Sequence, residues 1–276
     1  CTYPLPEKYV SSFLRVDSVK FFADGGLSGA TAAVSVPYQN TDFPSSGVLR
    51  FETEELYQLA LEAHTAGFRI GTHAIGDVAL DQMLEVYQRL EAAHPSGLRH
   101  RLEHVDANAH RARAKALGVI VVPQPIFLHE LSGNFERYLP PIFAPDCYNL
   151  RAMLDAGLTT AFSSDAPVVR EVNPLVGIHA AVNEPFRPGN AVTHEEAIEA
   201  FTIAGAVAQG DEGNRGTLEV GKWADFNVYG NADAAVPATL DAQPVVLDGG
   251  GRVTSLRGAA LAWSKNGQLR GASAPV

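Results

Sequence analysis

Residues 68–104, FRIGTHAIGDVALDQMLEVYQRLEAAHPSGLRHRLEH, carry the pattern of one strand–helix–strand unit. The run Phe68–Thr72 predicts a buried strand, and Leu98–Leu102 predicts the next one. Between them we predict an amphipathic helix over Asp77–Ala93, because one face carries Leu80, Met83, Leu84 and Tyr87. A strand, a helix and a second strand in this order predict two parallel strands joined by a crossover helix.

The same alternation continues on both sides of this unit. We predict further strands at 16–23, 118–122 and 158–162, which gives five strands near residues 19, 70, 101, 120 and 160. Helices are predicted over Thr53–Ala66, Asp106–Leu117 and Cys147–Ala156, with Thr53 as the cap of the first. The segments 24–50 and 123–146 are predicted to be long loops.

These elements predict an α/β fold that forms part of a (β/α)8 TIM-like barrel. A closed barrel needs eight strands, and we expect the missing ones to precede residue 1. After about residue 195 the pattern changes: we predict a helix over Glu195–Ala208 and then short strands at 224–229, 245–247 and 256–263. We therefore predict two domains, a partial barrel over 1–208 and a β appendage over 209–276.

Composition narrows the classes of partner. The formal net charge of −10 argues against a nucleic-acid partner, which needs a basic surface. No apolar run reaches the roughly 18 residues of a membrane span, and the first ten residues lack the pattern of a signal peptide. Two cysteines, Cys1 and Cys147, cannot form a disulfide framework. We therefore expect a cytoplasmic protein with no membrane partner.

Polar residues with metal-binding chemistry lie in or just after four predicted strands: Lys20, His73, His104 and Asp165. In a parallel barrel the carboxyl ends of the strands meet at one mouth, where active sites form. Imidazole nitrogens and carboxylate oxygens are suitable ligands for zinc and similar ions. Taken singly, each residue has a simpler interpretation: a structural histidine, a turn or capping aspartate, an ordinary lysine. The joint arrangement favours a metal site.

The remaining histidines fit this pattern less well. His129 and His179 are alternatives at the mouth, whereas we expect surface or supporting positions for His64, His94, His100 and His110. The loops 24–50 and 123–146 are expected to line a substrate pocket. Their aromatic residues suit either an apolar substrate group or packing beneath the loops. The substrate-binding residues are therefore left unassigned.

Seven segments of the chain occur in an order that is typical of one family. They are VKFFADGGLSGATA, THAIGDVALDQMLEVY, RHRLEHVD, VVPQP, FSSDAPV, NPLVGIHAAVN and GTLEVGKWADFNVYG. Together they resemble the amidohydrolase superfamily, and within it the YtcJ-like branch of the amidohydrolase 3 family. The resemblance covers about residues 10 to 265 and implies a distorted barrel with a small β-sandwich domain.

The resemblance also implies a metal centre of one or two divalent ions, usually zinc. Carried over to this sequence, the metal-site residues are Lys20, His73, His104 and Asp165, with Lys20 carbamylated in relatives that hold two metals. Asp165 would move the proton of a metal-activated water. The implied reaction is hydrolysis of a C–N bond in an amide, formamide or cyclic amide of small size.

One departure from the family pattern limits these expectations. The family's first strand carries a His-x-His pair, and this sequence contains none. We therefore expect an incomplete metal shell that binds at most about one zinc ion. The competing interpretation is a truncated, inactive half-barrel. Its open sheet edges would favour a homo-oligomer or another protein partner.

Overall fold

The computed structural model describes residues 4–11, 13–104 and 110–225, together with the strand backbone of 246–247, 253–256, 259–263 and 269–272. The chain divides into two compact units, Cys1–Val192 and Thr193–Val276. Among the described helices, none has both the length and the apolar character that a membrane crossing requires.

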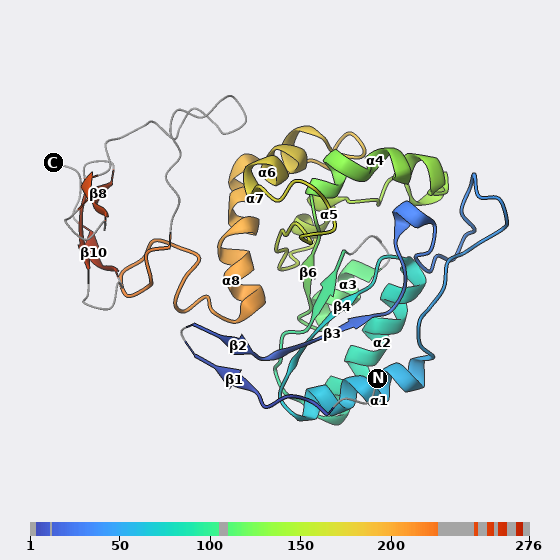
Figure 1. Cartoon of the computed structure of the whole chain (residues 1–276), viewed down its shortest axis with the longest axis horizontal. Helices are drawn as coiled ribbons and strands as arrows, with labels where there is room; N and C mark the ends of the chain where they lie inside the picture. The colour runs from blue at the N-terminus through green and yellow to red at the C-terminus, as the bar shows by residue number, and fades with distance from the viewer. Residues whose placement is uncertain are drawn as a thin grey trace. The chain divides into compact units, whose positions relative to one another are not determined.

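A parallel sheet forms the centre of the first unit (Figure 1). Its hydrogen-bonded order is β3 (Ser18–Phe22), β4 (Arg69–His73), β5 (Arg101–Glu103) and β6 (Ile120–Val122). A parallel bridge between Val121 and Thr160 adds a fifth position beside β6. The five predicted strand positions are thus parallel neighbours, and the α/β class is confirmed.

All these strands run in the same direction, so the sheet has two chemically distinct edges. We call them the carboxyl-end edge and the amino-end edge, after the ends of the strands that meet there. The register aligns Phe22 with His73 and His73 with Glu103 at the carboxyl ends. Because the predicted metal-site histidines lie at or just after these ends, the sheet delivers them to one edge.

Helices between the strands follow the predicted pattern. Helix α1 spans Thr53–Thr65 and lies beside α2, Asp77–Ala93, as Figure 1 shows. The predicted apolar face of α2 is buried. Helix α3 spans Arg111–Ala116, and residues 106–109 of that predicted helix lie outside the described part. Helix α5, Leu150–Asp155, is shorter than predicted.

The predicted loop over 123–146 is wrong, because helix α4 occupies Ile126–Tyr138. Its apolar face buries Ile126, Phe127, Leu128 and Phe135, and it lies beside α6, Pro174–Asn183. The sequence around Gly133 reads as a turn, but tertiary packing of the aromatic residues outweighs that local preference. The short helices η1 (Leu27–Gly29) and η3 (Pro141–Phe143) and the antiparallel pair β1 (Tyr9–Val10) and β2 (Arg15–Val16) complete this unit.

The predicted cap of α1 is also wrong. Glu52 holds the capping position and makes no side-chain capping bond, while Thr53 is already helical. The hydroxyl of Thr53 instead accepts a hydrogen bond of 3.2 Å from Nε2 of Gln82 on α2. The threonine therefore joins two helices, a contact that local sequence does not reveal.

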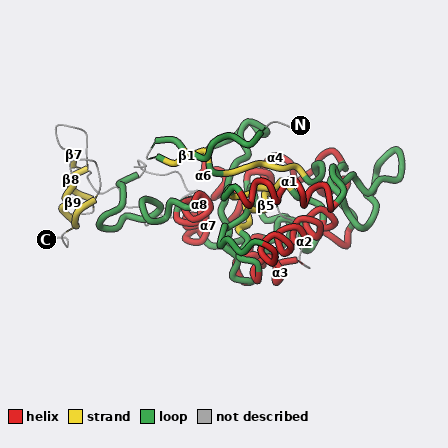
Figure 2. The backbone as a smooth tube through the Cα atoms, turned by 90° about the horizontal axis from the view of Figure 1, so that it is seen from below, coloured by secondary structure: helices red, strands yellow, loops and turns green. Residues whose placement is uncertain are grey.

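The second unit contains two helices and an antiparallel sheet. The single predicted helix over 195–208 is divided into α7 (His194–Phe201) and α8 (Ile203–Gln209) by Thr202, whose hydroxyl donates to the carbonyl of Ile198. The sheet consists of β7 (Val246–Leu247), β8 (Val253–Leu256), β9 (Ala259–Trp263) and β10 (Leu269–Ala272) in the order β10-β9-β8-β7. Figure 2 shows β7, β8 and β9 as yellow neighbours.

Three expectations stay predictions. The strand expected at 224–229 falls largely on residues 226–229, outside the described part. The second layer of a β-sandwich and the closure of a barrel are likewise not part of the described structure. The division into units places α7 and α8 after Val192, whereas the predicted boundary at 208 would group them with the barrel.

Candidate metal centre

The four residues predicted for the metal site lie together at the carboxyl-end edge. The ring centroids of His73 and His104 are 4.6 Å apart. Nε2 of His104 lies 3.8 Å from Oδ2 of Asp165. The negative charge of Asp165 also stabilises the ammonium group of Lys20, a residue of β3. Residues separated by up to 145 positions in sequence thus share one site.

Two of these residues adopt backbone conformations that are unusual for their type. The φ angle is +77° at His104 and +54° at Asp165, both in the left-handed region. A residue other than glycine pays on the order of 1 kcal/mol or more for such a conformation. Strain of this kind concentrates at functional sites, where the surrounding structure holds a side chain in a required direction.

His73 is oriented by the loop that follows β3. Its Nε2 lies 2.7 Å from the carbonyl oxygen of Gly25, which can only accept a hydrogen bond. Nε2 therefore carries the proton, and Nδ1 carries the lone pair. Burial lowers the pKa of His73 below its usual value, which keeps the ring neutral. A neutral imidazole held by a carbonyl is the usual arrangement of a metal-binding histidine.

Asp24 holds the same loop in place. The sequence pattern indicates it only as part of a turn. Its fully buried carboxylate accepts hydrogen bonds from the backbone N–H groups of Ala33, Ile75 and Gly76, at 2.8 to 3.1 Å. Burial nevertheless raises its pKa to about 6. Oδ1 of Asp24 also lies 3.6 Å from Nε2 of His73. Asp24 thus joins the loop after β3 to the turn after β4, directly behind a predicted ligand.

His104 is the most deeply buried member of the site, with 3% of its surface exposed. The ring of Phe127 stacks on it at a centroid distance of 5.9 Å. Burial lowers the pKa of His104 to about 3. The ring is therefore neutral at physiological pH, and its Nδ1 has no hydrogen-bond partner.

Lys20 lies beside a glycine of β4, whose missing side chain leaves room for Arg101 and Glu103. Gly71 pairs with Lys20 on one side and with Arg101 on the other. A Cβ atom at this position would lie 3.0 Å from Nη2 of Arg101 and 3.0 Å from Oε1 of Glu103. Partial burial lowers the pKa of Lys20, while the carboxylates of Glu103 and Asp165 act in the opposite direction.

These donors fit a divalent cation. The separation of 3.8 Å between His104 and Asp165 is too long for a hydrogen bond. It is close to the span of two ligand bonds of roughly 2 Å that meet at one ion. Two neutral imidazoles and a carboxylate are also the donor types that zinc and related ions bind. Burial raises the pKa of Asp165, so this carboxylate is suited to accept a proton.

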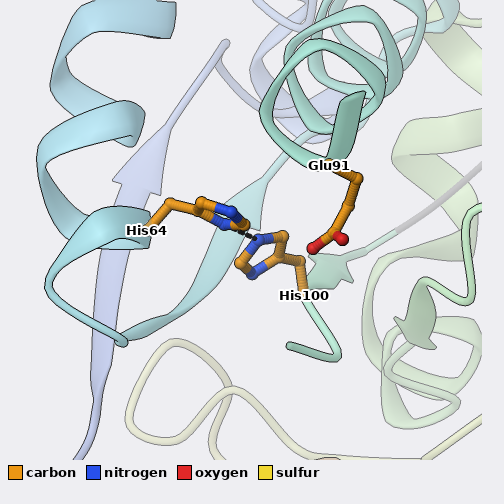
Figure 3. Close-up of side chains that lie close together, drawn as sticks. All are labelled: His64, Glu91 and His100. Carbon is orange, nitrogen blue, oxygen red and sulfur yellow. Dashed lines mark hydrogen bonds between the residues drawn. The ribbon is translucent and has the colours of Figure 1, made fainter. Parts of the chain in front are cut away.

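A second group of histidines lies at the amino-end edge (Figure 3). His64 from α1, Glu91 from α2 and His100 just before β5 place potential ligand atoms within 4.8 Å of one another. The surface or supporting position expected for His64 and His100 is wrong in one respect, because each is only 2% exposed. The pair fills the space between a helix and the sheet.

Hydrogen bonds in this second group oppose metal binding. The backbone N–H of Ile70 donates to Nδ1 of His100 at 3.1 Å, so the proton of His100 must lie on Nε2. That proton points to Nδ1 of His64 at 3.0 Å, and Nε2 of His64 donates to the carbonyl of His94 at 2.7 Å. All four ring nitrogens are therefore used. His100 could bind a cation through Nε2 only after losing this proton.

His129 and His179, the alternatives for the mouth, share a different partner. Nδ1 of His129 lies 2.9 Å from Oε2 of Glu184, and Nε2 of His179 lies 3.4 Å from Oε1. The side chains of both histidines are more than a third exposed. The contact of His129 with Glu184 joins α4 to the residue after α6, and His179 contacts the same carboxylate from within α6.

Comparison with known proteins agrees with the metal-binding geometry described above. The model described as "Amidohydrolase family" matches residues 4–254. A Bacillus subtilis (strain 168) protein whose name describes it as an amidohydrolase, YtcJ, is 30% identical over 251 residues, covering 85% of this chain and 46% of that protein. The N-substituted formamide deformylase of Arthrobacter pascens is 26% identical over 238 residues, with coverages of 81% and 42%.

A solved structure supports the likeness in three dimensions. It is an uncharacterized metal-dependent hydrolase from Pyrococcus furiosus, with a TM-score of 0.70 and 31% identity. The match covers 78% of this chain and 44% of that one. The chain thus spans less than half the length of each of these three proteins.

Proposed function

Because this chain belongs to the amidohydrolase family, we propose that it is a zinc-dependent hydrolase that cleaves the C–N bond of a small amide, formamide or cyclic amide. The observation that carries the proposal is the convergence of His73, His104 and Asp165 at the carboxyl-end edge. Two neutral imidazoles and a carboxylate that lie this close together form a donor set suited to a divalent cation.

Each side chain has a separate task in the proposed reaction. Nδ1 of His73, Nε2 of His104 and the carboxylate of Asp165 would hold the zinc ion. When bound, zinc would acidify a water molecule and polarise the scissile carbonyl. Asp165 would accept a proton at a carboxylate oxygen and later deliver it to the leaving nitrogen. The raised pKa of Asp165 supports this role, since it brings the carboxylate closer to the pH at which it must exchange protons.

We also propose that Lys20 is carbamylated when two ions are bound. The neutral amine adds to carbon dioxide, a new N–C bond forms, one proton leaves, and the side chain gains a carboxylate. The reaction requires a neutral lysine, and the lowered pKa of Lys20 favours that form.

The substrate class rests on likeness rather than on a pocket. The similar protein from Arthrobacter pascens is named for the deformylation of N-substituted formamides. Phe127 stacks on His104, but only 6% of its surface is exposed, so it supports the histidine and does not define the substrate. On the likeness alone we propose a small amide with a substituent on nitrogen.

A second candidate function is that of a half-domain that binds a complementary segment or a second copy of itself. The observation that favours it is that β3 is the outermost strand of the described parallel sheet and pairs there with β4 alone. Phe22 on this strand is 49% exposed. An edge strand with free backbone groups and an exposed aromatic residue is suited to pair with another strand.

One experiment compares the two candidates. The purified chain is titrated with zinc by calorimetry and assayed against a panel of N-substituted formamides and cyclic amides, beside a His73→Ala/His104→Ala double variant. We expect up to about one zinc ion per chain and zinc-dependent hydrolysis, both lost in the double variant. Zinc binding that is equal in the two proteins would refute the metal site. Zinc binding without hydrolysis, together with a dimeric mass in solution, would favour the half-domain.

A further inference from the structure

Gln124 follows β6 and is almost completely buried, with 1% of its surface exposed. Its Nε2 donates to the carbonyl oxygen of Val122 at 2.6 Å and to Oγ of Ser163 at 2.8 Å. Because a carbonyl oxygen can only accept, the nitrogen of the amide must face Val122. The orientation of this side-chain amide is therefore fixed by its surroundings.

The fixed orientation leaves one buried acceptor without a donor. Oε1 of Gln124 has no hydrogen-bond partner, and neither does Nδ1 of His104. The two residues meet at one point, because the backbone N–H of His104 donates to the same carbonyl of Val122, at 3.1 Å. Leaving two buried polar atoms unpaired is costly, whereas pairing them with each other removes both costs.

We propose that Gln124 is a positioning residue whose Oε1 accepts the Nδ1–H of His104 and so fixes the tautomer of that histidine. The lone pair then lies on Nε2, the nitrogen 3.8 Å from Asp165. The interaction with Gln124 raises the pKa of His104, opposite to the effect of burial. This is the effect expected when Gln124 accepts a hydrogen bond from the ring. The inference rests on the proposed function only where it concerns zinc.

The same amide also holds the segment that leads to Asp165. Ser163 accepts from Gln124 through Oγ, and its backbone N–H donates to the carbonyl of Pro123 at 3.1 Å. Gln124 thus contacts the environments of two predicted ligands that belong to different strands. Mutating a residue that hydrogen-bonds to a metal-binding histidine typically lowers metal affinity by about 10–100-fold.

Two substitutions separate the positioning role from a purely structural one. Gln124→Glu and Gln124→Met both lose the N–H groups that bind Val122 and Ser163. Only the methionine variant also loses the oxygen that accepts from His104. Ser163→Ala is a matched control, since it removes one partner of Gln124 and leaves Oε1 in place.

The first readout is the tautomer of His104 in the metal-free chain, from long-range proton–nitrogen spectra assigned with a His104→Asn variant. We expect a proton on Nδ1 in the wild type, in Gln124→Glu and in Ser163→Ala. In Gln124→Met we expect the Nε2–H form to gain population. The second readout is zinc affinity, which should fall about 10–100-fold in the methionine variant and clearly less in the other two.

The wild-type spectrum alone can overturn the proposal, even if the variants fail to fold. A proton on Nε2 of His104 in the wild type would refute it. Equal losses of zinc affinity in Gln124→Glu and Gln124→Met, with the tautomer unchanged, would also refute it. A correct tautomer in a chain that binds no zinc would instead refute the proposed function and leave the role of Gln124 intact.

Discussion

The two edges of the parallel sheet hold histidines in opposite hydrogen-bonding states. At the amino-end edge, His64 and His100 use all four ring nitrogens in a relay that ends on backbone groups. At the carboxyl-end edge, His73 keeps a lone pair on Nδ1, and the proposed bond from His104 to Gln124 leaves a lone pair on Nε2 of His104. Both groups bring metal-binding residue types together, so proximity alone does not identify a metal site. The tautomers distinguish them.

Backbone conformation separates the two edges in the same way. His104 and Asp165 adopt left-handed φ angles, whereas His64 lies within α1. A relaxed backbone with satisfied side chains is typical of residues that stabilise a fold. Strain with unsatisfied side chains is typical of residues that act on a ligand. Each of the following predictions tests one part of this contrast.

The largest effect is expected for Asp165→Asn in a protein that turns over substrate. Removing the proton-accepting carboxylate should lower kcat by about 10²–10⁴-fold. Asparagine tolerates the left-handed backbone at this position, so the thermal midpoint should change little. Steady-state kinetics and a thermal melt measure the two effects, and an unchanged kcat would remove Asp165 from the reaction.

The next largest effect concerns zinc affinity. His104→Ala should weaken zinc binding by at least about 100-fold, because it removes a ligand rather than a supporting residue. His64→Ala should leave the affinity within about twofold, since the hydrogen bonds at the amino-end edge leave no ring nitrogen for a cation. Calorimetry on both folded variants decides the matter. A large loss of zinc affinity in His64→Ala would place the metal at the amino-end edge and contradict our interpretation.

For the free energy of unfolding, we expect the histidines of the amino-end edge to matter most. His100→Ala removes a buried ring and leaves the N–H of Ile70 without its acceptor, so the free energy of unfolding should fall by about 2–4 kcal/mol. His94→Ala is the matched control: its side chain is exposed and only its backbone carbonyl joins the relay, so a change within about 0.5 kcal/mol is expected. Urea unfolding measures both. Equal effects would mean that the relay contributes little.

The same relay predicts a pH dependence of stability. Burial lowers the pKa of His100 from 6.5 to about 4, so the unfolded chain binds a proton more readily. The stabilisation is therefore complete above pH 6.5 and is lost as the pH falls towards 4, by about 3 kcal/mol in total. Urea titrations from pH 7.5 to 4.5 should show this slope in the wild type.

Subtracting the His100→Ala curve isolates this contribution from other groups. His64 and Glu91 face His100 from α1 and α2, and Tyr87 lies against its ring at 4.9 Å. Asp24, with a pKa raised by burial, acts in the opposite sense at the other edge and cancels in the difference. Parallel curves for the wild type and the variant would contradict the assignment.

The smallest effect is expected at the exposed pair of His129 and Glu184. His129→Gln should change the free energy of unfolding by less than about 0.5 kcal/mol, because surface ion pairs contribute little. Zinc affinity should also remain unchanged. A loss of zinc binding in this variant would extend the metal site towards α4 and α6.

Much of the fold follows from periodicity in the sequence. The helix over Asp77–Ala93 has the predicted bounds, because four apolar residues at helical spacing define its buried face. Helix α4 was missed, since the Ser-Gly-Asn sequence near Gly133 indicates a turn and only packing against other helices overrides it. Thr202 divides a helix that the pattern predicts as continuous.

The candidate site was predictable in its members and not in its chemistry. Strand ends of a parallel sheet share an edge, which is why His73, His104 and Asp165 could be grouped from sequence. Which nitrogen of each ring carries a proton depends on the carbonyl of Gly25 and on Gln124, and these contacts arise only in three dimensions. For the same reason the pairing of His64 with His100, 36 positions apart, was not foreseen.

The carboxylate of Asp24 has a consequence for how the molecule moves. It ties the loop near Ala33 to the turn at Ile75 and Gly76, and Arg50 at the far end of the same segment donates to the carbonyl of Asp24 at 2.8 Å. Opening this segment would break several buried bonds at once, so its amide protons should exchange with deuterium only in rare, cooperative events. The two ends of the segment 24–50 should therefore stay in place while the folded chain fluctuates.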